Sequence, residues 1–198
     1  MAKRRPGEGG NSLKYDNIVL TKEGRVGTIR MNEPKALNPL SVKTVAEISD
    51  AFNDVAKDDK IRVVILTGTG RAFSAGGDLK AMLDFFSQNP GQIQEELQTS
   101  HLTVVRMRKM EKPIIAAING LCFGAALDFI LACDIRISST EGKFCEAYLR
   151  VALTPGNGAM YWLPRYIGFG RALDMILNSK TIEADEALRI GLVDYVVS

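Results

Sequence analysis

The ten residues RAFSAGGDLK, from Arg71 to Lys80, join an apolar run at Val63–Thr67 to a new apolar segment that begins at Leu79. The run is apolar on both faces, which is typical of a central parallel strand covered by helices. Between strand and helix lies Ala75-Gly76-Gly77, where side chains are almost absent. Such a turn exposes backbone N–H groups to a ligand, and the following helix adds the positive end of its dipole. The stretch therefore predicts a binding site for an oxyanion.

The same order of elements occurs a second time along the chain. A predicted strand at 114–118 leads through Asn119-Gly120 to the small residues Gly124-Ala125-Ala126, which open an apolar helix. In open α/β folds such turns lie at one edge of the sheet, where ligands bind. One small-residue turn alone would more simply indicate close packing of helix on strand. Two matched turns favour a site in which the N–H groups of Gly77 and Ala125 stabilise the oxygen of a thioester as it becomes an enolate or a tetrahedral oxyanion.

The rest of the chain continues the alternation of strand and helix, which predicts an α/β fold. Two β-rich runs at 15–20 and 26–31 indicate a hairpin, and a helix is expected to open at Pro39 or Ser41. The other expected elements are helices at 78–86 and 92–110 with a break at 89–91, a strand at 134–137, a short run at 143–145, and helices at 159–163, 171–177 and 184–190, the last capped by Gly191.

Composition bounds the class of protein. The 198 residues are 46% hydrophobic and 24% charged, which is enough for one sizeable core. We expect a disordered Gly-rich tail over residues 1–13 and one domain over residues 14–198. The net charge of +2 argues against a nucleic-acid partner, because binding to a polyanion needs a basic surface.

The sequence also argues against several other kinds of site. No apolar run reaches the roughly 20 residues of a membrane span, so no membrane association is expected. Cys122, Cys133 and Cys145 match neither a zinc pattern nor an even, pairable set, which favours a reduced, cytoplasmic compartment. No cluster of ligand side chains indicates a metal, and the glycine pairs lack the third glycine of a dinucleotide motif.

Three segments resemble the enoyl-CoA hydratase/isomerase (crotonase) family. They are GTGRAFSAGGDLKAM (68–82), KPIIAAINGLCFGAALDFILACDIRIS (112–138) and the stretch from FCEAYLRVALTPGNGAMYW to GLVDYVV (144–197). The resemblance implies a crotonase-like spiral of repeated ββα units, acyl-CoA thioester substrates, lyase or isomerase activity, and homotrimers or dimers of trimers. Coenzyme A is then part of the substrate, and no separate cofactor is expected. Family members continue into further helices, so the C-terminal helical region is predicted to be shortened.

The resemblance also assigns roles to single residues. Gly77 and Ala125 match the two oxyanion donors, Asp128 matches a catalytic glutamate, and Tyr148 falls where the second catalytic acid is expected. The positions that match the substrate path are Ala36, Leu37, Ala75, Asp78, Leu79, Phe123, Pro155 and Gly156.

Asp128 follows Ala125 by three residues, so a helix that begins at Gly124 places its carboxylate on the same face as the donor amide. Its neighbours Leu127 and Phe129 are apolar. Desolvation is therefore expected to raise its pKa toward the range useful for proton transfer. The alternative role is that of a first-turn acid that complements the helix dipole.

Tyr148 is the main departure from the family pattern. Hydration of an enoyl thioester uses two carboxylates to orient and deprotonate water, and a phenol with a pKa near ~10 is a poor base. A 1,3 shift of the double bond needs one carboxylate, so Asp128 alone favours isomerisation over hydration. Glu146 could replace the second acid. Tyr148 could also serve an acyl-CoA hydrolase or decarboxylase, and a catalytically silent acyl-CoA-binding protein is the alternative outside catalysis.

Three further polar residues are assigned minor roles. Asp78 is expected to cap the helix that follows it. Ser74 lacks the G-x-S-x-G setting of a nucleophile. His101 is expected on a helix face or at a subunit contact. The acyl group is expected to contact Phe73, Met82, Phe86, Leu121, Phe123 and Trp162.

Overall fold

The computed structural model describes residues 15–88 and 93–198. The predicted tail over residues 1–13 and the predicted break at residues 89–91 lie outside this part. The hydrophobic core of the described residues joins the sheets to the helices, and it includes Phe52, Phe73, Phe129 and Phe144, all almost completely buried.

The main sheet has six strands. In spatial order they are β1 (Ile18–Glu23), β2 (Val26–Met31), β3 (Val63–Gly68), β5 (Ile114–Ile118), β7 (Ile135–Ser139) and β10 (Tyr195–Val197). β1 and β2 form the predicted antiparallel hairpin, and Glu23 pairs with Val26 across a two-residue turn. All the other pairings are parallel. β3 and β5 are the strands that precede the two small-residue turns.

A second sheet of four short strands stands between the main sheet and these turns. It contains β4 (Ala72–Ser74), β6 (Leu121–Phe123), β8 (Lys143–Cys145) and β9 (Ile182–Glu183). The first three pair in parallel. The strands β3, β5 and β7 are thus each followed by a short strand before the chain enters a helix, so the predicted spiral of ββα units is confirmed. We did not predict β4, β6 or β9, because strands of two or three residues have no periodicity to detect.

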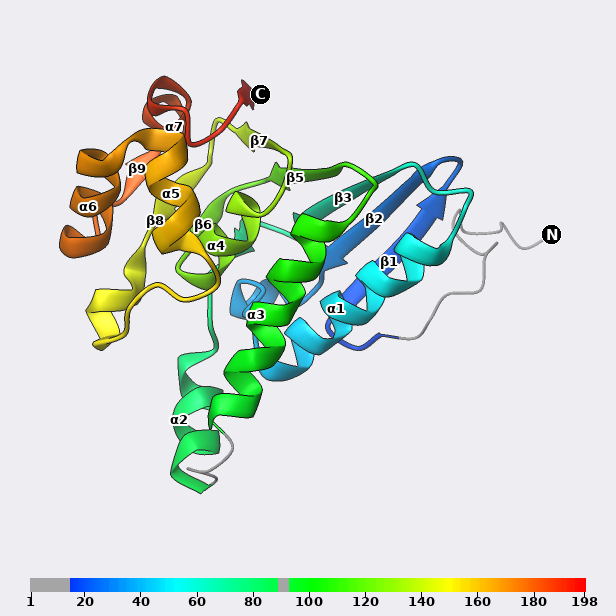
Figure 1. Ribbon diagram of the computed structural model, residues 1–198, viewed down its shortest axis with the longest axis horizontal. Coiled ribbons are helices and arrows are strands. Elements are labelled where there is room, and N and C mark those ends of the chain that lie inside the picture. Colours follow the sequence, from blue (N-terminus) through cyan, green and yellow to red (C-terminus); the bar gives the residue numbers. More distant parts are fainter. Residues whose placement is uncertain (1–14, 89–92) are drawn as a thin grey trace.

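Helices of the described chain pack against both sheets (Figure 1). They are α1 (Val42–Lys57), α2 (Leu79–Gln88), α3 (Ile93–Lys109), α4 (Ala125–Leu131), α5 (Ala159–Ile167), α6 (Phe169–Asn178) and α7 (Ala184–Ile190), with short 3-10 helices at Pro34–Ala36 and Ala147–Val151. α1 and α3 lie side by side over the hairpin end of the main sheet, whereas α5, α6 and α7 gather at the other end. Of the two predicted starts of α1, Pro39 and Ser41, the structure has Ser41, whose hydroxyl caps the helix, and Gly191 caps α7 as predicted.

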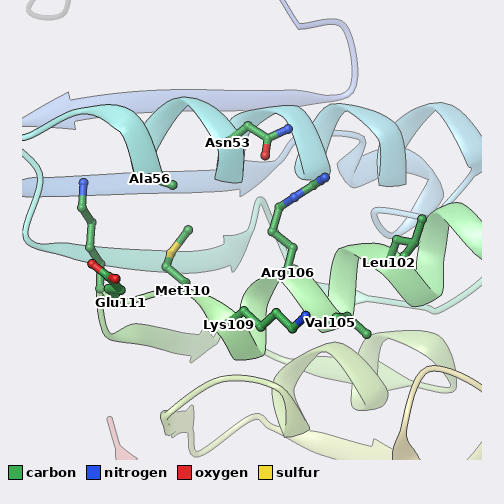
Figure 2. A pocket seen from close by; sticks show the side chains of 9 residues that line it. Asn53, Ala56, Leu102, Val105, Arg106, Lys109, Met110 and Glu111 are labelled. Carbon is green, nitrogen blue, oxygen red and sulfur yellow. The ribbon is translucent and has the colours of Figure 1, made fainter.

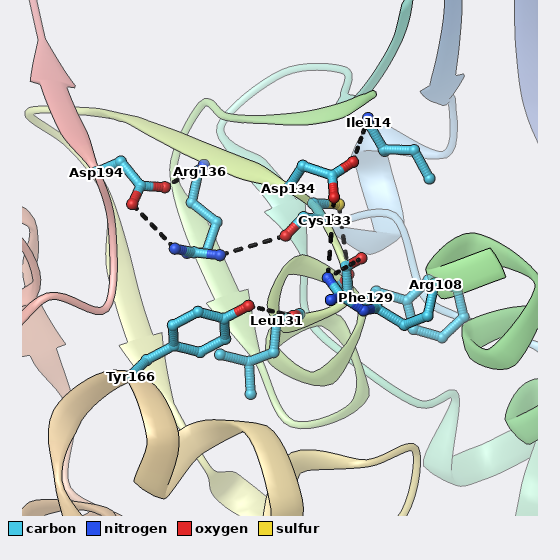
Figure 3. A network of polar contacts seen from close by, with 10 residues as sticks. Arg108, Ile114, Phe129, Leu131, Cys133, Asp134, Arg136, Tyr166 and Asp194 are labelled. Atoms are coloured by element: carbon cyan, nitrogen blue, oxygen red, sulfur yellow. Dashed lines mark hydrogen bonds and ion pairs between the residues drawn. The ribbon is translucent and has the colours of Figure 1, made fainter. Parts of the chain in front are cut away.

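A buried arginine fixes the C-terminal segment to the main sheet (Figure 3). Arg136 on β7 is 3% exposed. It donates to the backbone of Leu192 at 2.8 Å and to the carboxylate of Asp194 at 3.0 Å, and its guanidinium lies 4.1 Å from the ring centre of Tyr166. These contacts satisfy a charge that would otherwise be costly to bury. They hold α5 and the strand β10 against the part of the fold that carries the turns.

Candidate active site

The two small-residue turns touch each other. Strands β4 and β6 pair in parallel, with Ala72 opposite Leu121, and each leads directly into its turn. Gly76 has φ +94, and a Cβ atom placed on it would lie 2.5 Å from the carbonyl oxygen of Phe123 and 3.5 Å from the amide nitrogen of Ala125. Only glycine allows this approach, because a side chain would collide with the second turn. The close packing and the predicted convergence of the turns are therefore one feature.

The backbone around the first turn is held by neighbours other than the two predicted donors. The N–H of Ala75 donates to Leu37 at 2.9 Å, and the carbonyl of Gly76 accepts from Leu40 at 2.8 Å. Ser74 accepts from the N–H of Gly76 through its hydroxyl, which is a structural role. Among the hydrogen bonds of residues 15–88 and 93–198, none is donated by the N–H of Gly77 or Ala125. Both amides thus keep their hydrogen-bonding capacity for a ligand.

Asn38 holds the strand that leads into the first turn, and the sequence analysis did not predict this role. Its side chain is buried, and its amide nitrogen donates to the carbonyls of Ala72 and Phe73 at 2.9 and 3.3 Å. Its oxygen accepts from the N–H of Glu33. A single asparagine in a predicted loop gives no signal for such a role, because the carbonyls to which it donates are more than 30 residues away.

The second turn carries the acid. Gly124 has φ 52 and donates to the carbonyl of Cys145 at 2.8 Å, which ties the start of α4 to the end of β8. Ala125 is the first residue of α4, and Asp128 follows one turn later. Asp128 is completely buried. Its carboxylate accepts a short hydrogen bond of 2.5 Å from the hydroxyl of Tyr148. The structure therefore joins two of the predicted catalytic residues directly.

Burial dominates the electrostatics of this pair. Loss of solvent raises the pKa of Asp128 to about 7, while hydrogen bonds from Tyr148 and Asn157 act in the opposite direction. The pKa of the Tyr148 hydroxyl is raised by its burial and by the negative charge of Asp128, so the phenol keeps its proton. Asp128 can thus exchange a proton near neutral pH, whereas Tyr148 can donate a hydrogen bond but cannot act as a base.

Glu146 lies in the same cluster. It is completely buried, and it precedes the 3-10 helix Ala147–Val151. Because the chain turns there, the alternation of a strand does not relate Glu146 to Tyr148. Burial and the nearby charge of Asp128 raise the pKa of Glu146 well above its usual range. The site therefore holds a second carboxyl group. It lies two residues before Tyr148, the position to which the family pattern assigns the second acid.

The sequence profile of the enoyl-CoA hydratase/isomerase family matches residues 21–198. This chain belongs to that family. It is 37% identical over 186 residues to the short-chain-enoyl-CoA hydratase of Clostridium acetobutylicum and 38% identical over 188 residues to the crotonyl-CoA hydratase of Syntrophomonas wolfei. Each alignment covers 93% of this chain and 70% of the relative. The crystal structure of an enoyl-CoA hydratase from Bacillus anthracis is 34% identical, with a TM-score of 0.85 over 92% of this chain and 70% of that one. The predicted family and fold are confirmed.

Most residues that the enoyl-CoA hydratase/isomerase resemblance placed on the substrate path lie around the first turn. Ala36 and Leu37 end the 3-10 helix Pro34–Ala36, and Leu37 contacts the turn through its carbonyl. Asp78 accepts from the N–H of Ala81 at 2.9 Å, so it caps α2 as predicted. Leu79, at the start of α2, is 45% exposed. Ala75 belongs to the turn itself, so this group of residues lies on one side of the predicted oxyanion site.

Phe123, Pro155 and Gly156 lie on the side of the second turn. Phe123 ends β6 and is half-buried. Gly156 faces His101 on α3, since a Cβ atom on this glycine would lie 3.2 Å from the imidazole Nε2. His101 is exposed on the face of α3, which is one of its two predicted placements, and it lies next to the loop that carries Pro155. Asn157, the residue after Gly156, acts on the pKa of Asp128 and was missed, because an isolated asparagine between glycines reads as an ordinary turn.

Two of the residues predicted to contact the acyl group, Phe73 and Trp162, pack against other parts of the protein. Phe73 is part of the main core. Trp162 carries the guanidinium of Arg108 at 4.3 Å and stacks on Tyr166. Met82 does approach the turn, with its sulfur 3.3 Å from a Cβ placed on Gly77. The side chain of Phe86 lies outside the described part.

A separate groove runs between α1 and α3, away from the turns (Figure 2). No residue predicted for the site lines it. Its lining residues are Asn53, Ala56, Leu102, Val105, Arg106, Lys109, Met110, Glu111 and Lys112.

Replacing Gly76 with alanine is expected to destabilise the protein by more than about 1–3 kcal/mol, the usual cost of a strained backbone conformation alone. The new methyl group would also meet the carbonyl of Phe123. Urea denaturation measures the change. Gly170→Ala is the matched control, since a Cβ at Gly170 on α6 meets no atom within 4 Å, and it should be neutral or slightly stabilising. Equal stability of the two variants would contradict the packing of the turns described above.

Proposed function

We propose that this protein isomerises the double bond of an enoyl-CoA thioester, with Asp128 as the base that moves the proton. Family membership supports the enoyl-CoA substrate class. The observation that carries the proposal is the hydrogen bond from Tyr148 to Asp128. In this pair, the position of the second acid holds the phenol of Tyr148, and the carboxylate of Asp128 has a pKa near neutrality.

The reaction needs no group beyond these residues and the substrate. The carboxylate of Asp128 takes a proton from C2 of a 3-enoyl thioester, and the electron pair of that bond moves toward the thioester oxygen. The N–H groups of Gly77 and Ala125 donate to this oxygen and stabilise the dienolate. Asp128 then returns the proton to C4, and the double bond forms between C2 and C3. No water is consumed and no charge is left behind.

Hydration is the second candidate, favoured by the names of the two relatives described above, both enoyl-CoA hydratases. It would need Glu146 or Asn157 to help hold the attacking water in place of the missing second glutamate. The buried carboxyl of Glu146 beside Asp128 gives this candidate its structural support.

One absorbance assay separates the two reactions. Isomerisation of 3-hexenoyl-CoA creates a conjugated thioester, so the absorbance of the conjugated enoyl group rises. Hydration of 2-hexenoyl-CoA removes that conjugation, so the absorbance falls. We expect the first reaction to be faster; a faster second reaction would overturn isomerisation as the main activity. Release of free thiol would indicate an acyl-CoA hydrolase, loss of CO₂ from a carboxylated substrate a decarboxylase, and binding without any turnover a silent acyl-CoA-binding protein.

We further propose that the reaction requires no cofactor and that the protein assembles as a homotrimer or a dimer of trimers in the cytoplasm. Turnover that is unchanged after dialysis against a chelator supports the first point, and light scattering coupled to size-exclusion chromatography measures the assembly. Cys122, Cys133 and Cys145 are buried and unpaired, which is compatible with a reducing compartment. In the part of the chain that the structure describes, no helix is both long and apolar enough to span a membrane.

A further inference from the structure

Three buried oxygen atoms in the active site have no hydrogen-bonding partner among the described residues. They are Oδ1 of Asp128 and both carboxyl oxygens of Glu146. Both side chains are completely buried. A buried polar atom without a partner costs roughly 1–3 kcal/mol, and a buried charge without one costs more. Three such atoms in one cluster therefore indicate that the ionisation state of the pair differs from that of two ordinary carboxylates.

The fold brings the two carboxyl groups together from separate elements. Gly124, at the start of α4, is hydrogen-bonded to Cys145, the residue before Glu146. One helical turn further along α4, Asp128 is bonded to Tyr148, the second residue after Glu146. The segment that carries Glu146 is thus fastened to α4 on both sides. The negative charge of Asp128 acts directly on Glu146.

Among the described residues, no basic side chain offsets the charge of these two acids. The side chains that act on Asp128 are the hydroxyl of Tyr148, from the 3-10 helix, and the amide of Asn157, from the loop before α5. Both carboxyl groups act in turn on the thiol of Cys122 on β6. In the described chain no lysine, arginine or histidine contributes to the environment of either carboxyl. Two adjacent carboxylates in such a site cannot both ionise at neutral pH, because each desolvated charge opposes the other.

The hydrogen bonds decide which group carries the charge. Tyr148 and Asn157 both stabilise the ionised form of Asp128. No hydrogen bond from the described residues stabilises an ionised Glu146. The charge therefore belongs on Asp128 and the proton on Glu146. A protonated Glu146 also turns one of the three unpartnered acceptors into an O–H donor, and Oδ1 of Asp128 is an acceptor in the same cluster.

We propose that Glu146 is a positioning residue that retains a proton and donates it in a hydrogen bond to Asp128, so that the two form a proton-sharing pair. Tyr148 holds one oxygen of Asp128 and Glu146 holds the other, which fixes the base toward the substrate. In turnover Asp128 gains and loses the substrate proton while the proton of Glu146 stays in place. The catalytic consequence rests on the function proposed above, but the proton-sharing pair itself does not.

Infrared difference spectroscopy of the unliganded protein tests the pair without any substrate. At a pH about two units above the pKa of Asp128, where that carboxyl group is ionised, the wild-type protein should show the carbonyl band of a protonated, buried carboxyl group, and Glu146→Gln should lack it. Glu23→Gln, which changes an exposed glutamate at the end of β1, should keep the band. A wild-type spectrum without a protonated carboxyl, or a band that persists in the Glu146→Gln protein, would overturn the proposal even if no substrate is turned over.

The pH dependence of kcat/KM tests the consequence for catalysis. In the wild type it should rise as Asp128 ionises and fall about tenfold per pH unit once Glu146 loses its proton at high pH. Glu146→Gln keeps a neutral donor that cannot ionise, so it should retain the rising limb and lose the falling one. A merely structural role would lower activity at every pH and leave both limbs in place, which would contradict the positioning role. Absence of turnover with an intact infrared band would instead count against the proposed function alone.

Discussion

Replacing Ala125 with proline is expected to lower kcat on an enoyl-CoA substrate by about 10²–10³-fold, equivalent to roughly 2.7–4 kcal/mol of transition-state stabilisation. The substitution removes the N–H of one of the two proposed oxyanion donors. Ala125 is the first residue of α4, a position where proline fits because its N–H takes no part in the helix. The fold should therefore survive a change that removes the donor. Steady-state kinetics on the substrate that the wild type prefers measures the effect.

Ala125→Gly is the matched control, because it alters the same position and keeps the N–H. It should retain kcat within a few-fold of the wild type. Thermal denaturation of both variants separates loss of the donor from loss of structure. A folded Ala125→Pro protein with the kcat of the glycine variant would show that this amide is not an oxyanion donor.

Asp128→Asn is expected to reduce turnover by about 10²–10⁴-fold, the usual contribution of a positioned base. Asparagine has almost the same shape, and its side-chain oxygen can still accept the hydrogen bond from Tyr148. It removes the group that exchanges the proton and leaves the surroundings in place. The loss should therefore appear in kcat, and calorimetry should find nearly unchanged binding of a saturated acyl-CoA.

Tyr148→Phe provides the comparison for this result. It removes the hydroxyl that orients Asp128 but keeps the carboxylate, so its loss of kcat should be smaller than that of Asp128→Asn. Full turnover by the asparagine variant, on every enoyl-CoA that the wild type converts, would remove Asp128 from the mechanism.

The long elements of the fold could be predicted from the sequence because their signals are local. The apolar run Val63–Thr67 lies within β3, and the helical period from Ser41 onward matches α1. The short strands β4, β6 and β9 could not be found, because each is defined by partners elsewhere in the chain rather than by its own two or three residues. β10 was also missed, since its place beside β7 depends on distant contacts, among them the bonds from Arg136 to Leu192 and Asp194 just before the strand.

The candidate site shows the same division. Gly77 and Ala125 could be proposed from composition and spacing, since small residues at the end of a strand leave the backbone amides accessible. The three-residue spacing from Ala125 to Asp128 predicted that the carboxylate lies on the same helix face as the donor amide. The contributions of Asn38 and Asn157 could not be predicted, because they depend on distant backbone and side-chain partners. The place of Glu146 beside Asp128 depends on a turn of the chain that its short sequence does not reveal.

The central claim is that Gly77, Ala125 and Asp128 together form and stabilise a thioester enolate. Exchange of the C2 protons of a saturated acyl-CoA in D₂O, followed by mass spectrometry, tests it most directly, because such a substrate can be neither hydrated nor isomerised. With butyryl-CoA and hexanoyl-CoA we predict exchange well above the buffer rate in the wild type and in Ala125→Gly, and exchange near the buffer rate in Ala125→Pro and Asp128→Asn. Unchanged exchange in the Asp128→Asn protein, or no exchange by a wild type that still converts enoyl-CoA, would contradict the claim.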